Sequence, residues 1–209
     1  MTTPIKIYIL CINSQACELI CGQYQLSPSS KVKLNSRKSD LAKKQFVASR
    51  ALIQYIYIND FNTETDNTIQ IIEGVTPTME DSPELHIAIS HSQEYVAVAI
   101  SEQPIGLDIE RPYRGRNYHE IANKAFHPNE SAWIKGATDE AQLESRFFET
   151  WTAREGLFKL GYLENLLDQS IDALQEIKKG DFSPFFYKEP NLYVFAVTAT
   201  PATFSINLI

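Results

Sequence analysis

The sequence predicts an α+β fold of two pseudo-symmetric halves, each a small β-sheet with helices. Each half contains a helical pattern and several strand patterns in loosely the same order. The chain has 209 residues, 44% of them hydrophobic, which is enough for one large domain or two small ones. No low-complexity linker divides it. We expect an N-terminal half over 1–102, a C-terminal half over 103–209, and the active site in the cleft between them.

The first half combines one long helix with several strands. Alternating residues rich in Ile and Tyr predict the first strand. Ser39 can cap the helix, along which apolar residues recur every three or four positions. The polar stretch at 27–30 indicates a loop, and the predicted turn at 90–94 joins two strands. The predicted elements are strands at 5–12, 69–72, 85–90 and 95–100 and a helix at 39–57.

The second half opens with a strand and closes with three more. Its longest helical pattern carries Leu143, Phe147, Trp151 and Phe158 on its apolar side and stops at Gly161. A shorter helix has proline at its first position, where the missing N–H costs nothing. The predicted helices are 118–126, 128–135 and 138–160, and the predicted strands are 105–109, 182–187, 192–198 and 203–208.

Composition excludes several function classes. A formal net charge of -7 gives no basic footprint for nucleic acid, although a local cluster can still bind an anion. Cys11, Cys17 and Cys21 have no nearby histidine, so we expect reduced thiols rather than zinc ligands. The N-terminus lacks the features of a signal peptide, and no run approaches the roughly 20 apolar residues of a membrane helix. A soluble, cytoplasmic protein is expected.

The stretch Ile-Gly-Leu-Asp-Ile-Glu at 105–110 carries two acidic side chains on a predicted strand. Asp108 and Glu110 are two positions apart, so both point to the same face. Two adjacent carboxylates repel and favour a cation between them, and carboxylate oxygens suit Mg²⁺. Taken alone, such a pair is more often a solvated strand face.

The predicted helix at 138–160 carries a second chemical group. Glu155 and Lys159 are one turn apart and share a face, and Trp151 lies one turn earlier on the same stripe. This carboxylate can complete a metal site, and the lysine can meet a phosphate as a point charge. An ordinary surface ion pair is the alternative.

A third group is Ser90-His91-Ser92, in the predicted turn. Its hydroxyl, imidazole and backbone N–H groups suit phosphate oxygens, although a hydrogen-bonded turn histidine is equally compatible. A weaker basic set lies near the first helix, and one or two of its members can bind a terminal phosphate of a ligand. This set comprises Lys31, Lys33, Arg37, Lys38, Lys43, Lys44 and Arg50.

Together these motifs resemble the 4'-phosphopantetheinyl transferase superfamily, in particular its longer, monomeric, surfactin-synthetase-activating type. The family marks are a hydrophobic-Gly-hydrophobic-Asp-x-Glu strand and a later Trp-Ser/Thr-x-Lys-Glu-x-x-x-Lys helix. Here they stand as IGLDIE and WTAREGLFK, with 47 positions between Asp108 and Glu155. The Ser-His-Ser turn at 90–92 and the helix start Phe-His-Pro-Asn-Glu at 126–130 also match. The resemblance covers about residues 85–161.

The resemblance implies a holo-[acyl-carrier-protein] synthase type of transferase. Phosphopantetheine would pass from coenzyme A to a serine of an apo acyl or peptidyl carrier protein, releasing 3',5'-ADP. Asp108, Glu110 and Glu155 would hold Mg²⁺ on the pyrophosphate, and Lys159 would contact the same phosphates. Glu155 or a water would take the serine proton. Asp108, Glu155 and Lys159 are thus the expected catalytic residues.

The resemblance also implies contacts to coenzyme A from Ser90, His91 and Lys159, to which Arg50 and Arg154 are added as basic candidates. Arg154 stands where the family has lysine, and Gly156 stands where serine or alanine is commoner. These departures support one alternative, a non-catalytic module that binds coenzyme A or a carrier protein. A second alternative is another Mg²⁺-dependent phosphoryl-transfer enzyme that uses the same carboxylates. The expected protein is a monomer that binds neither nucleic acid nor membrane.

Overall fold

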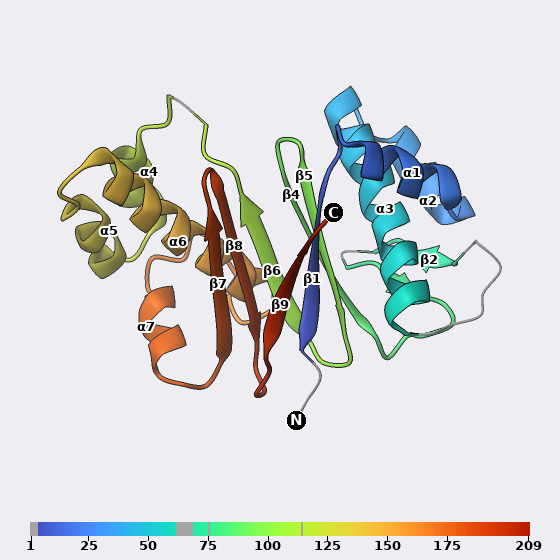
Figure 1. The fold of residues 1–209 in the computed structure, drawn as a ribbon. Coiled ribbons are helices and arrows are strands. Elements are labelled where there is room, and N and C mark those ends of the chain that lie inside the picture. Colours follow the sequence, from blue (N-terminus) through green and yellow to red (C-terminus); the bar gives the residue numbers. More distant parts are fainter. Residues whose placement is uncertain (1–3, 62–68, 75, 114) are drawn as a thin grey trace. The chain divides into compact units, whose positions relative to one another are not determined.

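The computed structural model describes residues 4–61, 69–74, 76–113 and 115–209 and confirms a mixed α+β fold (Figure 1). The chain forms two compact units. The first contains Met1–Pro104 together with Thr203–Ile209, and the second contains Ile105–Ala202. The predicted boundary after residue 102 lies two residues from the observed one. The prediction that residues 203–209 belong to the C-terminal half is wrong, because their strand pairs with the first strand of the chain.

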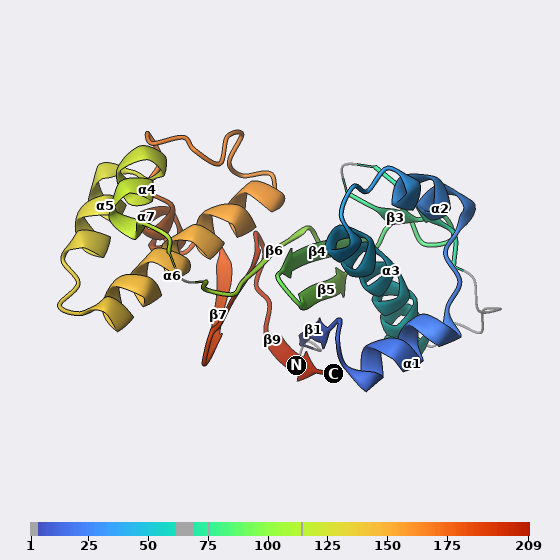
Figure 2. The ribbon, with the colours of Figure 1, turned by 90° about the horizontal axis from the view of Figure 1, so that it is seen from above.

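The first unit is a four-stranded sheet with helices on one face (Figure 2). Strands lie in the order β4-β5-β1-β9, antiparallel except for the parallel pair β1–β9. Ser39 caps α3 as predicted, and α3 packs on β5 over a core that includes Leu52, Ile56 and Val98. The elements are β1 (Ile5–Cys11), α1 (Gln15–Gln23), α2 (Pro28–Asn35), α3 (Asp40–Asp60), β2 (Ile71–Ile72), β3 (Thr78–Met79), β4 (His86–Ser92), β5 (Tyr95–Ser101) and β9 (Phe204–Leu208).

Two local features of this unit differ from the sequence prediction. The polar stretch at 27–30 opens α2: the Ser27 side chain accepts a hydrogen bond from the Ser30 N–H, and Pro28 takes the first helical position. Strand β4 continues to Ser92, so the turn consists of Gln93 and Glu94 alone. Gln93 has φ 51°, the left-handed conformation that short hairpin turns need.

The second unit is a three-stranded antiparallel sheet, in the order β6-β8-β7, with α6 across one face (Figure 2). Two apolar clusters join α6 to its neighbours, one with α4, α5 and Tyr193 and one with α7 and Phe195. The Phe158 side chain is exposed, which corrects its predicted place on the apolar side. The elements are β6 (Ile105–Glu110), α4 (Tyr118–Ala125), α5 (Pro128–Lys135), α6 (Glu140–Lys159), α7 (Ala173–Lys178), β7 (Ser183–Glu189) and β8 (Leu192–Thr198).

Two glycines bring α6 into backbone contact with the sheet. A Cβ atom on Gly106 of β6 would lie 1.9 Å from the Gly156 carbonyl oxygen of α6. A Cβ atom on Gly156 would lie 2.4 Å from Cδ1 of Phe195 on β8. Neither position has room for a side chain, so both glycines are required for this close packing. Gly156, an unusual residue in the family motif, thus has a structural reason.

We expect Gly106→Ala to lower the free energy of unfolding by about 1–3 kcal/mol, because the added methyl group meets rigid backbone. Gly22→Ala is the matched control. Gly22 lies inside α1 with no atom within 4 Å of an added Cβ, and alanine is favoured over glycine in a helix by about 1 kcal/mol. The midpoint temperature of thermal unfolding should therefore be lower for Gly106→Ala and higher for Gly22→Ala than for the original protein. Equal shifts for the two variants would contradict the close packing.

Candidate active site

Strand β6 presents Gly106, Asp108 and Glu110 on the face that α6 covers. Alternate residues of a strand share a face, and Gly106 faces α6 directly. Asp108 pairs in register with Phe195, whose ring also lies beneath α6. Asp108 is buried and Glu110 is partly exposed at the end of the strand. The two predicted carboxylates therefore lie together under the helix.

Helix α6 supplies the lysine and the third carboxylate. Lys159 Nζ lies 2.7 Å from Asp108 Oδ1 and 3.8 Å from Glu155 Oε2. Because Glu155 and Lys159 are one turn apart, both reach the same edge of the helix. The structure thus brings Asp108, Glu155 and Lys159 together from a strand and a helix that are far apart in the sequence.

The electrostatics of this site favour a cation. Burial raises the pKa of the Glu155 carboxyl, and the charges of Asp108 and Glu110 raise it further, while Lys159 opposes the shift. The three carboxylates are close enough to repel, and the lysine ammonium lies between two of them. Among the described residues, no group of three or more His, Cys, Asp or Glu side chains is already arranged around a metal position.

Ser90 and His91 lie on β4 of the first unit. They are consecutive strand residues and point to opposite faces, so Ser90 is buried and His91 is exposed. Ser90 is opposite Ala97 and His91 is opposite Val96 in the β4–β5 ladder. The prediction of an open turn at these residues is wrong, because the strand continues through them.

Arg154 is fully buried, which corrects its predicted contact with coenzyme A. Its Nη1 donates to Glu130 Oε2 at 2.9 Å and to the carbonyl oxygen of Ile171. Its Nε and Nη2 donate to the carbonyl oxygens of Leu166 and Asp168. The side chain is 0% exposed and every guanidinium nitrogen has a protein acceptor. Arg154 therefore fixes the loop before α7 to α6.

Arg50 is also held inside the protein, in the first unit. Its Nε and Nη2 form a two-pronged pair with Glu73, at 2.7 Å each, and its guanidinium stacks over the Phe46 ring. Burial opposes ionisation of Glu73, but the hydrogen bonds and charge of Arg50 outweigh it and lower the pKa of this carboxyl. Glu73 neutralises the charge of Arg50, and the contact of Arg50 with coenzyme A stays a prediction.

Glu130 is a buried carboxylate that links three segments of the second unit, and the sequence analysis assigned it no chemical role. Its Oε2 accepts from the His127 N–H and from Arg154, and its Oε1 accepts from the Ala173 N–H at the start of α7. Burial raises the pKa of this carboxyl, and the Arg154 charge opposes the shift. The sequence feature that could have revealed this role is the proline-containing helix start at 127–130, where Glu130 takes part in a capping box.

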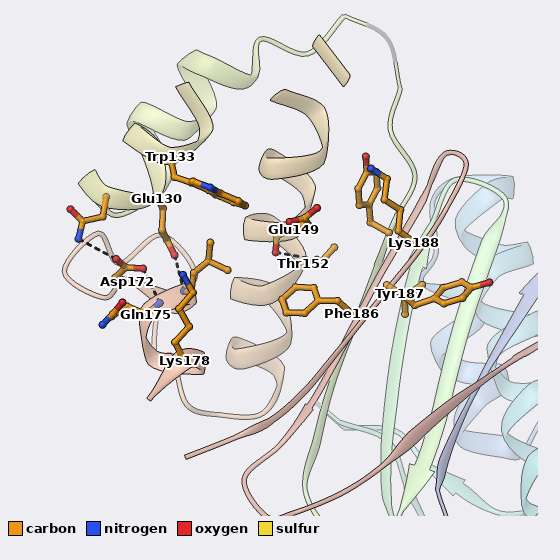
Figure 3. Close-up of a pocket in the computed structure, with 14 residues that line it drawn as sticks. Glu130, Trp133, Glu149, Thr152, Asp172, Gln175, Lys178, Phe186, Tyr187 and Lys188 are labelled. Carbon is orange, nitrogen blue, oxygen red and sulfur yellow. Dashed lines mark hydrogen bonds between the residues drawn. The ribbon is translucent and has the colours of Figure 1, made fainter. Parts of the chain in front are cut away.

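A pocket of about 680 Å³ lies elsewhere in the second unit (Figure 3). Its walls come from α5, α6, α7 and the β7–β8 hairpin, and none of the three carboxylates or Lys159 lines it. Trp133 and Phe186 lie on different sides of it (Figure 3). The sequence interpretation missed it, because its lining comes from four separate segments.

Residues 104–201 match the family model of the 4'-phosphopantetheinyl transferase superfamily. This range covers nearly the whole second unit, including β6 and α6 with their acidic residues and lysine. The match agrees with the resemblance found from the motifs, and it covers slightly less than half of the chain.

Two curated relatives match shorter stretches of the chain. The 4'-phosphopantetheinyl transferase gsp of Aneurinibacillus migulanus is 42% identical over 76 residues, which is 36% of this chain and 31% of that protein. The 4'-phosphopantetheinyl transferase Sfp of Bacillus subtilis (strain 168) is 34% identical over 83 residues, 40% of this chain and 36% of that protein. The matches span about a third of each relative. No helix within the described residues is long and apolar enough to cross a membrane.

Proposed function

We propose that the protein is a 4'-phosphopantetheinyl transferase, which moves phosphopantetheine from coenzyme A to a serine of an apo carrier protein. One observation carries the proposal: β6 and α6 bring Asp108, Glu155 and Lys159 together within the superfamily region. The transferase names of the relatives support the same reaction.

The donor set suits Mg²⁺. Asp108, Glu110 and Glu155 offer only oxygen atoms, and their mutual repulsion makes a divalent cation favourable there. We propose these three as its ligands. Bound there, the ion would neutralise pyrophosphate charge and polarise the phosphorus. Lys159, which now lies against Asp108, would then be released to contact a phosphate oxygen.

The remaining chemistry belongs to the side chains. The carrier serine oxygen forms a bond to the β-phosphorus, and the bond from this phosphorus to the leaving 3',5'-ADP breaks. Glu155, or a water molecule beside it, accepts the serine proton. Lys159 stabilises the negative charge that develops on the leaving group.

Coenzyme A also needs contacts outside the phosphate centre. We propose that His91, exposed on β4, contacts the phosphate end of the nucleotide. Ser90 is buried on the opposite face of this strand, and its contact with coenzyme A stays a prediction. Arg50 and Arg154 are left out, because both are held by buried carboxylates. Lys159 is the remaining basic residue of the predicted coenzyme A set.

The wider assignment follows from the reaction. The partner is an apo acyl or peptidyl carrier protein, and the expected working form is a monomer. We propose the cytoplasm as its location, in keeping with the free thiols of Cys11, Cys17 and Cys21.

Mass spectrometry tests the proposal directly. Incubation with coenzyme A, Mg²⁺ and a panel of apo acyl and peptidyl carrier proteins should give a carrier heavier by one phosphopantetheine. Omitting Mg²⁺, or replacing the acceptor serine of the carrier with alanine, should abolish the product. Coenzyme A binding by calorimetry with no product on any carrier would instead identify a non-catalytic binding module. Phosphate release from nucleotides without a carrier would identify a different phosphoryl-transfer enzyme.

A further inference from the structure

The pocket of the second unit has the size and lining of a ligand site. Its volume of about 680 Å³ falls within the roughly 300–1,000 Å³ of small-molecule pockets. Trp133 of α5 and Phe186 of β7 are 37% and 45% exposed, an unusual state for two large aromatic side chains that line the same pocket. Both rings extend toward α6, whereas Tyr187 points away (Figure 3). Aromatic walls of this kind favour a flat, apolar body.

The charges around the pocket are balanced. Glu130, one of its lining acids, is neutralised by Arg154. Of the other lining residues, two are acidic and two are basic: Glu149, Asp172, Lys178 and Lys188. Ser145 links one acid to one base, because its hydroxyl donates to Glu149 Oε1 and accepts from Lys188 Nζ. A strongly charged ligand would therefore gain no net attraction, which argues against a nucleotide.

Polar groups at the pocket suit the ends of a neutral molecule. The Gln175 amide is exposed on α7, and the Asn129 amide donates to Asp172 at the pocket margin. We propose that this pocket binds an uncharged amphipathic molecule, with a flat apolar body between Trp133 and Phe186 and hydrogen-bonding groups at its ends. The site is separate from the carboxylates of the proposed transfer reaction, although Glu149 and Thr152 of α6 border it.

A matched pair of fluorescent probes tests this site. N-phenylnaphthylamine is a neutral aromatic amine, and anilinonaphthalene sulfonate carries the same rings with an added negative charge. The full chain, without coenzyme A, should bind the neutral probe with one molecule per chain and about tenfold more tightly than the sulfonate. Equal or tighter binding of the sulfonate, or binding that never saturates, would overturn the proposal.

Variants then locate the probe. Trp133→Ala removes one wall, and Gln175→Trp fills the pocket from exposed α7 without removing a core contact. Each should weaken binding of the neutral probe by at least about tenfold. Val32→Ala removes an exposed apolar side chain of the first unit and should leave binding unchanged. Unchanged binding in Gln175→Trp, or equal losses in all three variants, would refute the assigned site. Because the titration needs neither carrier nor coenzyme A, its failure would leave the transfer reaction untouched.

Discussion

Asp108→Asn is expected to reduce phosphopantetheine transfer by at least about a thousandfold, an increase of roughly 4 kcal/mol in the barrier. The substitution keeps the shape of the side chain and removes the charge that lies 2.7 Å from Lys159. In the proposed reaction this carboxylate is a metal ligand on a rigid strand, so no neighbouring group replaces it. The initial rate of carrier modification at saturating coenzyme A and Mg²⁺ measures the effect.

Two comparisons make that measurement specific. Glu84→Gln neutralises an exposed carboxylate of the first unit and should transfer at the original rate. Lys159→Ala should chiefly weaken coenzyme A binding, by about tenfold to a hundredfold, because a hydrogen bond to a charged group contributes roughly 1.5–3 kcal/mol. Calorimetry separates this loss from the rate. Transfer by Asp108→Asn at the original rate, in protein that unfolds at the same temperature as wild type, would remove Asp108 from the proposed mechanism.

The central motif was predictable because two regular elements carry it. Strand periodicity puts Asp108 and Glu110 on one face of β6, and helix periodicity puts Glu155 and Lys159 on one face of α6. The sequence did not predict how the strand and the helix pack against each other. Gly106 and Gly156 allow their backbones to come into contact. In the sequence, Gly156 was noted only as a departure from the family motif.

Long-range pairing was harder to predict. The alternation that defines β9 identifies a strand but names no partner, and its parallel pairing with β1 joins residues almost 200 positions apart. Local signals for α2 were present in Ser27 and Pro28, yet its polar composition favoured a loop. Hydrophobic periodicity is weak in such helices, whose capping residues carry most of the information.

Burial of charge was the least predictable property. The sequence shows that Arg50 and Arg154 carry positive charges, and the family resemblance suggested that these charges contact phosphate groups. Tertiary structure instead surrounds each with acceptors from distant segments: Glu73 lies 23 positions from Arg50, and Glu130 lies 24 positions from Arg154. Neither spacing corresponds to a helical or strand period, so no local pattern reveals these pairs.

Arg154→Met is expected to lower the free energy of unfolding by about 3–5 kcal/mol, since it leaves the Glu130 carboxylate buried without its cation. The loss is a large part of the roughly 5–15 kcal/mol that stabilises an ordinary domain. Urea unfolding at neutral pH measures it. Arg146→Met, on the same helix, removes a partly exposed arginine that stacks on Trp133 and should cost about 1 kcal/mol or less.

A double-mutant cycle separates the ion pair from the other contacts of Arg154. Adding Glu130→Gln to Arg154→Met removes the unpaired charge while an amide oxygen remains to accept from the Ala173 N–H. The double variant should therefore be less destabilised than the sum of the two single variants. The double variant should still be less stable than the original protein, because the carbonyl oxygens of Leu166, Asp168 and Ile171 lack their hydrogen-bond donor. Additive losses would show that the pair is not coupled, and a loss no larger than that of Arg146→Met would show that burial of Arg154 contributes little to the fold.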